Sequence, residues 1–580
     1  MQLPELRLPV RGHGLRPRAP TRPRELARWA ESLPQGDGER TAAEVLERLR
    51  SLNLHSYGPH QRAMLMAVVR PLAEDVLAGL RRPLLGASVP LDARRRRAAS
   101  DIQQILEELA HAEKLIISAL AVQRRLRPSD LELLKEATYG AVAYLAHRLL
   151  ECYGVYANEP PGVWRELHQL FRFAEAHDLH TDLIEGIDAK ASPSVGRCIE
   201  HAYKRIVLLA IAEPYHLMAG EAAELYKVLE AWAGGCQMLP LGGLPPNGEF
   251  VIDFAVDMAP RFVSRDLLVR PVAGRILDIT EPKAALESVV RQLLRRRGAN
   301  GQSECIGLAE RQRRDMFMRL SDAWAGNPSR HSPRHPRQAE LQVAIGLNAC
   351  HYQISAGAPF TPEMDALKIA TSMRHPGMAH GSARPREEET PHGSFAQAYR
   401  DALEKDRRHQ PRKPYEPQSC LQINQSGDGI GLRRPLGGAV PVSVGELAAY
   451  RRAGASGTAW RIGVIRWLHA EGEGALEMGI RNLANRAMAV GVKGLAGIGA
   501  GGGYFRGLLL PPIAAGSSQA TLLTPASIFD VGSVLQVIDR RQLRRLQLTR
   551  IVLSTRAFSE FEFRPAGNGQ PPAHTGASAF

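Results

Sequence analysis

The hydrophobic pattern between about residues 41 and 235 is helical. Apolar residues recur there at intervals of three and four, the spacing of one face of an α-helix. One run begins at Ser100 and the next at Ser129, and Gln103 and Glu132 complete a capping box at each start. Further runs continue the pattern toward residue 235, so we expect an all-α domain over 41–235.

The pattern changes after this region. Residues 236–326 combine a Gly/Pro-rich turn, the strand-like run Phe250–Phe254 and the basic helical run Ala284–Arg297. We expect a mixed segment here that links the helical domain to the rest of the chain.

From residue 337 the period of the pattern is two. Leu341, Val343, Ile345 and Leu347 alternate with smaller or polar residues, which is typical of a strand with one buried face. Short strand-like runs separated by glycine turns follow, and they predict an antiparallel β-barrel over 327–485. They are Leu421–Ile423, Val440–Tyr450, Trp460–Leu468 and Leu476–Ile480.

Two stretches complete the division of this half of the chain. Residues 356–419 are rich in Pro, His and charged residues, so we expect an inserted loop with one short helix near Phe395–Lys405. Residues 486–563 contain further strand-like runs, which predict a second β domain and a candidate degenerate barrel. The runs are Tyr504–Leu510, Ala520–Leu523, Ser533–Ile538 and Leu546–Phe563. The predicted fold class is therefore multidomain α+β, a helical N-terminal region followed by two β domains.

The composition limits the functional classes. Apolar residues make up 44% of the chain, as in a folded protein, and no apolar run approaches the ~18 to 20 residues that a membrane-spanning helix needs. The six cysteines form no CxxC pair and no signal-peptide core follows the N-terminus, so we expect a cytoplasmic protein. The Arg- and Pro-rich residues 1–40 and the Pro/Gly-rich residues 564–580 are expected to be disordered.

The net charge of +14 would attract polyanions. Arginine greatly outnumbers lysine even in the helical runs, a bias that codon usage explains as well as a binding face does. The charge alone therefore does not favour nucleic-acid binding.

Two short motifs bracket the first strand-like block of the predicted barrel. Arg330 and Arg334 form RxxxR in a stretch that prolines keep out of a helix. Asn424, Ser426 and Gly429 form (D/N)xSxxG directly after a strand, and the glycine is suited to a left-handed conformation or a close backbone approach.

In this order the motifs resemble those of the PilZ family of cyclic di-GMP receptors. The resemblance continues through Val444–Leu447, Gly463–Trp467 and Met478–Ile480, which look like later strands of the family. Arg334 and Asn424 lie 90 positions apart, farther than is usual in the family, and the insertion accounts for the difference.

The resemblance implies that cyclic di-GMP is the ligand and that Arg330, Arg334, Asn424, Ser426 and Gly429 bind it. A planar guanidinium can donate in parallel to a guanine edge or to phosphate oxygens and can stack on a base. Asn424 and Ser426 offer short polar groups on one side of a strand. His335 and Arg337 are adjacent and could assist.

The resemblance also implies a signalling role rather than catalysis. We expect ligand binding to be passed to a protein partner through the helical region, with outputs in attachment, pilus or flagellar motility that these residues do not distinguish. The sequence has no Walker A, HExxH or GxSxG motif and neither GGDEF nor EAL, so we expect no enzyme. The alternative is a basic scaffold or nucleic-acid-binding protein with a degenerate barrel.

Two further patterns carry less weight. His177 and His180 lie near Asp178 without a third ligand at a recognisable spacing, so we expect a helix-end polar cluster and no metal site. Gly497–Gly502 matches GxGxxG, but no helix pattern follows it, so we expect a flexible linker between the two β domains.

Overall fold

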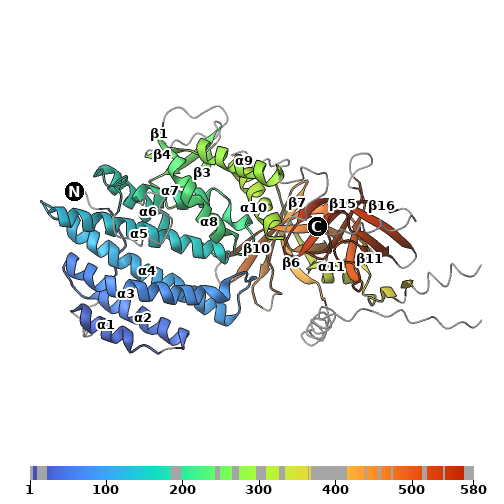
Figure 1. Ribbon diagram of the computed structural model, residues 1–580, viewed down its shortest axis with the longest axis horizontal. Helices are drawn as coiled ribbons and strands as arrows, with labels where there is room; N and C mark the ends of the chain where they lie inside the picture. The colour runs from blue at the N-terminus through green and yellow to red at the C-terminus, as the bar shows by residue number, and fades with distance from the viewer. Residues whose placement is uncertain are drawn as a thin grey trace, which may run out of the picture. The chain divides into compact units, whose positions relative to one another are not determined.

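The computed structural model divides the chain into two compact units (Figure 1). The first unit contains Met1–Arg296, Met316–Arg330 and Leu468–Leu476, and the second contains Arg297–Asp315, His331–Trp467 and Glu477–Phe580. The structure describes residues 4–9, 22–34, 36–184, 198–241, 248–263, 273–295, 308–325, 334–363, 365–366, 415–437, 440–454, 459–471, 474–512, 519–539 and 542–566.

The first unit is built on α-helices, as the hydrophobic spacing predicts. They are α1 (Pro23–Glu31), α2 (Gly38–Leu54), α3 (Pro59–Arg81), α4 (Ala93–Ala121), α5 (Pro128–Gly154), α6 (Val163–Ala176), α7 (Ile199–Ala210) and α8 (Glu221–Trp232). Their apolar faces form one core in which Ile105, Leu145 and Leu167 are fully buried.

Two helix starts differ from the sequence prediction. Helix α4 begins before Ser100, because the side chain of Asp92 accepts a hydrogen bond from the Arg95 amide at 2.8 Å and caps the helix there. Helix α5 begins at Pro128, and the carboxylate of Asp130, not Glu132, accepts from the Arg127 amide at 3.0 Å. Arginines Arg94–Arg97 therefore lie inside the exposed first turns of α4.

The expected disordered arm over residues 1–40 contains ordered structure. Helix α1 lies within it, and its Leu26 is fully buried in the helical core. Helix α2 begins at Gly38, with the Asp37 side chain as its cap. A helix that buries so few side chains leaves no clear period in the sequence, which explains why the pattern did not reveal it.

The region expected as a mixed linker shares the helical core. Strands β1 (Gln237–Pro240), β2 (Glu249–Asp253), β3 (Arg261–Val263) and β4 (Gly274–Asp278) form an antiparallel sheet in the order β1-β4-β2-β3. Phe250, Ile252 and Leu277 of this sheet join the core of the helices, as do Phe317 and Trp324. The last two residues belong to α10 (Leu308–Trp324), which follows α9 (Thr280–Arg295).

The first predicted barrel is confirmed as a closed antiparallel barrel. It is formed by β5 (His335–Ile345), β6 (Gln418–Gln425), β7 (Gly429–Pro435), β8 (Leu447–Arg452), β9 (Arg461–Glu471) and β10 (Ala475–Ala484), in the order β10-β7-β6-β5-β8-β9. Leu347 does not continue the first strand as its alternation predicts. It begins α11 (Leu347–Ile354) after Gly346, whose φ of 90° ends the strand. Residues 440–446 precede β8 rather than forming part of it.

The second β domain is also a closed barrel. Its strands are β11 (Met488–Ala496), β12 (Phe505–Leu510), β13 (Thr521–Pro525), β14 (Val534–Ile538), β15 (Leu543–Ser554) and β16 (Phe558–Pro565), in the order β11-β12-β13-β16-β15-β14. Gly497–Gly502 joins β11 to β12 inside this barrel, so the expected linker between domains at these glycines was wrong.

The two barrels have the same topology. Numbered from its own first strand, each has the neighbour order 1-2-3-6-5-4 around the ring. Equivalent glycines precede the fourth strand of each barrel: Gly445 and Gly532 have φ of 90° and 89°, and their amides donate to the carbonyls of Ile465 and Leu548, each at 2.8 Å. This shared hydrogen bond supports a common architecture for the two barrels.

The barrels pack on each other through apolar outer faces. Leu447, Ile462 and Val464 of the first barrel share a cluster with Leu508 and Leu523 of the second. Helix α11 contributes Leu347 and Cys350 to the same cluster and contacts strands of both barrels. The outer face of β5, β6 and β7 near residues 421–433 is not part of this cluster.

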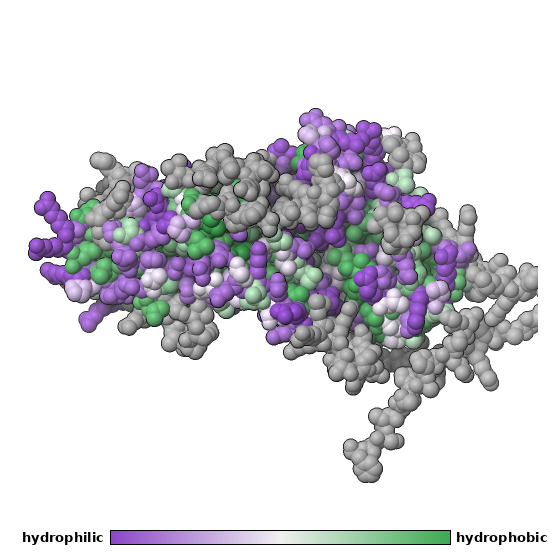
Figure 2. Space-filling model, turned by 90° about the horizontal axis from the view of Figure 1, so that it is seen from above, coloured by the Kyte–Doolittle hydropathy of each residue, from purple (hydrophilic) through white to green (hydrophobic). Residues whose placement is uncertain are grey.

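The outer surface of the protein is mostly polar where Figure 2 shows it, with hydrophobic residues scattered among hydrophilic ones. In the part of the chain that the structure describes, none of the helices has both the length and the apolar character needed to cross a membrane. The expected helix near Phe395–Lys405, most of the expected insertion and the tail beyond residue 566 lie outside the described residues.

Candidate nucleotide-binding site

The hairpin of β6 and β7 carries the (D/N)xSxxG motif. Gln425 pairs with Ile430, and the Ser426 amide donates to the Gly429 carbonyl at 2.9 Å to close the turn between the strands. Within the turn, the hydroxyl of Ser426 donates to Oδ1 of Asp428 at 2.7 Å. The motif is therefore a short polar turn at one end of the first barrel.

A bulge turns Asn424 to the outer face of the barrel. The pairing of β6 with β7 shifts between Gln422 and Asn424, so Asn424 lies opposite Gly431. A Cβ atom built on Gly431 would lie only 2.6 Å from Oδ1 of Asn424. The Asn424 amide thus lies directly over Gly431, which has no side chain. This face of the barrel therefore presents a polar amide close to the backbone of the strands.

Gly429 is required for a reason other than the left-handed conformation considered from the sequence. Its φ is not positive, but a Cβ there would lie 2.6 Å from the carbonyl oxygen of Ile480 in β10. The Asp428 carbonyl also accepts a hydrogen bond from the Asn482 amide at 2.8 Å. The motif turn is therefore fixed against β10 by close backbone contact.

The pairing of β5 with β6 brings one motif arginine to the same end of the barrel. His335 lies opposite Gln425 and Pro336 opposite Asn424, so Arg334 precedes β5 beside the motif turn. Arg334 is exposed, and it makes no hydrogen bond or ion pair with another described residue that would hold it away from a ligand. Arg330 lies outside the described residues. The structure thus brings together Arg334, Asn424, Ser426 and Gly429.

Arg337 is held beside the motif by two glutamines. Its guanidinium Nη1 donates to Oε1 of Gln425 at 2.7 Å. The same oxygen accepts from Nε2 of Gln422 at 3.4 Å, and Gln422 is only 4% exposed. A buried amide therefore orients Gln425, and Gln425 orients a further guanidinium toward the turn. Sequence adjacency pointed to Arg337, but the glutamine pair could not be found without the strand pairing.

The backbone of a third arginine, Arg481, lies near the motif, and sequence reasoning missed it. Its Cα lies 3.6 Å from the position that a Cβ on Gly429 would occupy, and its side chain is exposed. The pairing of β10 with β7 creates this proximity, and no sequence motif marks it. Arg334 and Arg337 make the surroundings of the turn basic, with Asp428 as the acidic residue of the turn itself.

The barrel interior also contains charge, toward the end of the barrel opposite the motif turn. Arg434 is 2% exposed, its Nη2 donates to the Val440 carbonyl at 2.7 Å, and its Nη1 donates to Gln418. Burial lowers the pKa of Arg434. Burial raises the pKa of Glu446 to about 7, although the Ser443 amide and the charge of Arg434 oppose this shift.

The histidines considered as metal ligands pack against aromatic rings. The ring of His177 lies edge-on to Phe173 at 5.0 Å between centroids, and the ring of His180 lies edge-on to Phe171 at 6.2 Å. Within the described residues no group of three or more His, Cys, Asp or Glu side chains is arranged to hold a metal ion.

The equivalent place in the second barrel is apolar. Its second strand, β12, ends in Leu508–Leu510 followed by Pro511, where the first barrel has the polar motif. Leu508 and Leu510 lie in the cluster between the barrels. The described part of the second barrel therefore does not repeat the polar site.

Three family models match the chain in order. Residues 24–241 match the N-terminal domain of the cyclic-di-GMP receptor FimW, 249–488 its middle PilZ domain, and 490–566 the FimW C-terminal beta-barrel domain. The cyclic-di-GMP receptor FimW of Pseudomonas aeruginosa is 29% identical over 576 residues, which cover 94% of this chain and 90% of that protein. No solved structure matches the chain significantly.

These matches agree with the order of domains in the structure, a helical unit followed by two barrels. The second match includes both the RxxxR and the (D/N)xSxxG motifs. The chain therefore belongs to the PilZ-domain family of cyclic-di-GMP receptors.

Proposed function

We propose that the protein is a cyclic di-GMP receptor whose ligand binds on the outer face of the first barrel, at the turn between β6 and β7. The observation that carries this proposal is the pairing of His335 with Gln425, which brings Arg334 to Asn424 and Ser426. Family membership supports the choice of ligand.

The chemistry of these residues suits a dianion that carries two guanines. Arg334, with Arg330, supplies planar guanidinium groups for guanine edges or phosphate oxygens, and one good bidentate contact contributes about 1–3 kcal/mol. The Asn424 amide can both donate to and accept from a base edge. Gly431 has no side chain, so the Asn424 amide lies close against the strand and a ligand can approach this face of the barrel closely.

We further propose that binding is communicated to a protein partner through the helical unit. In the sequence, the arginine segment 330–334 is the connection between α10 and β5. Ligand that fixes this segment would change the freedom of the connection, and it can shift an equilibrium only by its different affinity for the two states. Control of attachment, pili or flagellar motility in the cytoplasm is the output that the family resemblance suggests.

Calorimetry on the full chain tests the proposal. We expect saturable binding of cyclic di-GMP in the micromolar range or tighter, with at least tenfold weaker binding for Arg334→Ala and Asn424→Ala. Arg452→Ala is the matched control, because Arg452 is an exposed arginine on β8 of the same barrel and not on the hairpin.

The same titration separates the alternative function. Absence of a saturable nucleotide site in the folded wild-type protein, together with salt-dependent binding of DNA or RNA, would favour a basic scaffold with a degenerate barrel. Equal losses for Arg452→Ala and Arg334→Ala would show that binding depends on charge alone rather than on the motif.

A further inference from the structure

A short extended segment at the start of the chain docks on the helical unit. Within residues 4–9, Pro4 is buried and Leu6 packs against the helical core. The amide of Arg7 donates to Oε1 of Glu166 at 2.7 Å, and Nε2 of Gln169 is within 3.5 Å of Oε2 of Glu5. The segment therefore contacts successive turns of α6.

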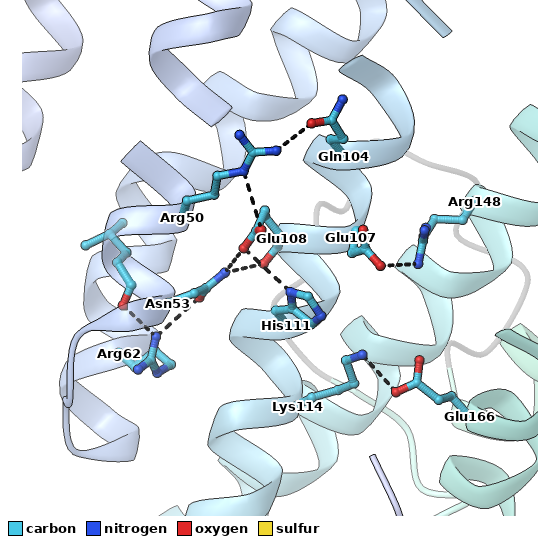
Figure 3. A network of polar contacts seen from close by, with 11 residues as sticks. Arg50, Asn53, Arg62, Gln104, Glu107, Glu108, His111, Lys114, Arg148 and Glu166 are labelled. Carbon is cyan, nitrogen blue, oxygen red and sulfur yellow. Dashed lines mark hydrogen bonds and ion pairs between the residues drawn. The ribbon is translucent and has the colours of Figure 1, made fainter. Parts of the chain in front are cut away.

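The carboxylate that receives the segment belongs to a buried ion pair. Glu166 is 4% exposed and also accepts a hydrogen bond from Nζ of Lys114 at 2.9 Å (Figure 3). Lys114, on α4, is 1% exposed. Replacement of a buried ion pair by well-packed apolar side chains of similar volume is often neutral for stability, so the free energy of unfolding alone does not account for this pair. Here the pair presents an oriented acceptor to an incoming backbone amide.

The Arg7 side chain has its own contact surface. Its guanidinium donates to the Pro161 carbonyl and lies over Gly162, where a Cβ would be 2.3 Å from Cζ of Arg7. Asp257 fixes this loop by accepting hydrogen bonds from the Gly162 and Arg165 amides. Asp257 lies between β2 and β3, so the small sheet holds this loop in place. Gly162, the loop residue beneath the Arg7 guanidinium, has no side chain.

The segment itself is weakly buried for its length. Glu5 and Arg7 are exposed, and Leu8 is 38% exposed. Such a segment can remain bound because it is part of the same chain, since a short tether gives an effective concentration in the millimolar range. Of the residues that receive the segment, Lys114, Glu166 and Gly162 are buried, whereas Pro161 is exposed.

We propose that this surface, formed by Lys114, Glu166, Pro161 and Gly162 and called here the α6 groove, binds an extended peptide of a protein partner. The peptide that fits has an arginine directly after an apolar residue, like Leu6-Arg7, and residues 4–9 occupy the groove in cis until the partner peptide replaces them. The inference concerns the helical unit and does not depend on cyclic di-GMP.

A labelled peptide with the sequence of residues 1–12 tests the α6 groove on the full chain lacking residues 1–9. We expect saturable binding by fluorescence anisotropy, and at least tenfold weaker binding for the peptide with Arg7→Ala. A peptide N-methylated at Arg7 lacks the amide donor to Glu166 and should lose at least tenfold as well. N-methylation at Leu8, whose amide donates to no other described residue, is the matched control and should change affinity less than threefold.

Competition by the native segment is the second expected result. The intact chain should bind the same peptide at least tenfold more weakly than the truncated chain does. The proposal is overturned if the truncated, folded protein shows no saturable binding up to 1 mM peptide, a concentration in the effective range of a tethered segment. It is overturned equally if the Arg7→Ala or Arg7-methylated peptide binds as well as the native one, or if the intact chain binds as tightly as the truncated chain.

Discussion

Arg337 illustrates how single side chains on neighbouring strands define this site. It contacts Gln425, and Gln425 is oriented by the buried Gln422. We expect Arg337 to contact the ligand directly. The side-chain amide of Gln425 holds the Arg337 guanidinium in place without contacting the ligand, so Gln425 is a positioning residue.

This relation predicts a non-additive pair of substitutions. Arg337→Ala should weaken cyclic di-GMP binding at least tenfold, because a hydrogen bond to a charged group contributes about 1.5–3 kcal/mol. Gln425→Ala should weaken it less, about threefold, and should have no further effect in the Arg337→Ala protein. The salt dependence of affinity should fall for Arg337→Ala but not for Gln425→Ala, since only the first removes a charge. Calorimetry at two salt concentrations measures both effects, and additive losses would show that Gln425 acts independently of Arg337.

Glu446 predicts a pH dependence of barrel stability. Its pKa in the folded protein is raised to about 7 from an ordinary value of 4.5, mainly because it is buried. The folded state therefore holds its proton more tightly than the unfolded state does. The resulting stabilisation is complete below about pH 4.5 and is lost as the pH rises through about 7.

Glu446→Gln, which stays neutral, should thus have nearly the wild-type Tm at pH 5 and a higher Tm at pH 8.5. The shift in pKa corresponds to about 3 kcal/mol, enough for a difference of several degrees. Thermal melts at both pH values measure the change, and Glu477→Gln on β10 is the control. A Tm difference that is the same at both pH values would contradict the prediction.

At the scale of elements, the sequence located most strands of both barrels but missed two. In β7, the inward-facing Arg434 interrupts the apolar alternation, and its hydrogen bonds to Gln418 and Val440 explain how the barrel accommodates it. In β11, glycines at positions 491 and 494 reduce the apolar signal. Both strands are defined by pairing with distant partners, which a local pattern does not contain.

In the candidate site, too, local features could be predicted from the sequence and non-local ones could not. The motif turn could be identified from Asn424, Ser426 and Gly429 alone, because their spacing is local. The proximity of Arg334 to this turn depends on the pairing of β5 with β6, and that of Arg481 on the position of β10. The ends of the insertion show a further non-local contact: Arg506 of β12 lies over the rings of both Phe360 and Tyr415, at 5.0 and 5.6 Å from their centroids.

At the scale of the whole chain, the shared apolar cluster makes the two barrels depend on each other. Leu447, Ile462 and Val464 lie on the outer face of the first barrel. They are fully buried because α11 and the second barrel cover them. Removing the second barrel would expose these side chains as one apolar patch, and such patches promote aggregation. The duplicated architecture therefore forms one folded body rather than two independent modules.

A fragment of residues 334–485 should consequently be less stable than one of residues 334–566. We expect the longer fragment to unfold in one cooperative transition and to remain monomeric. The shorter fragment should bind a hydrophobic dye or aggregate, and replacing Ile462 and Val464 by polar residues should restore its solubility. Thermal melts and light scattering measure these outcomes, with the same polar replacements in the longer fragment expected to destabilise it. A soluble, fully stable shorter fragment would show that the cluster is dispensable and that the first barrel folds alone.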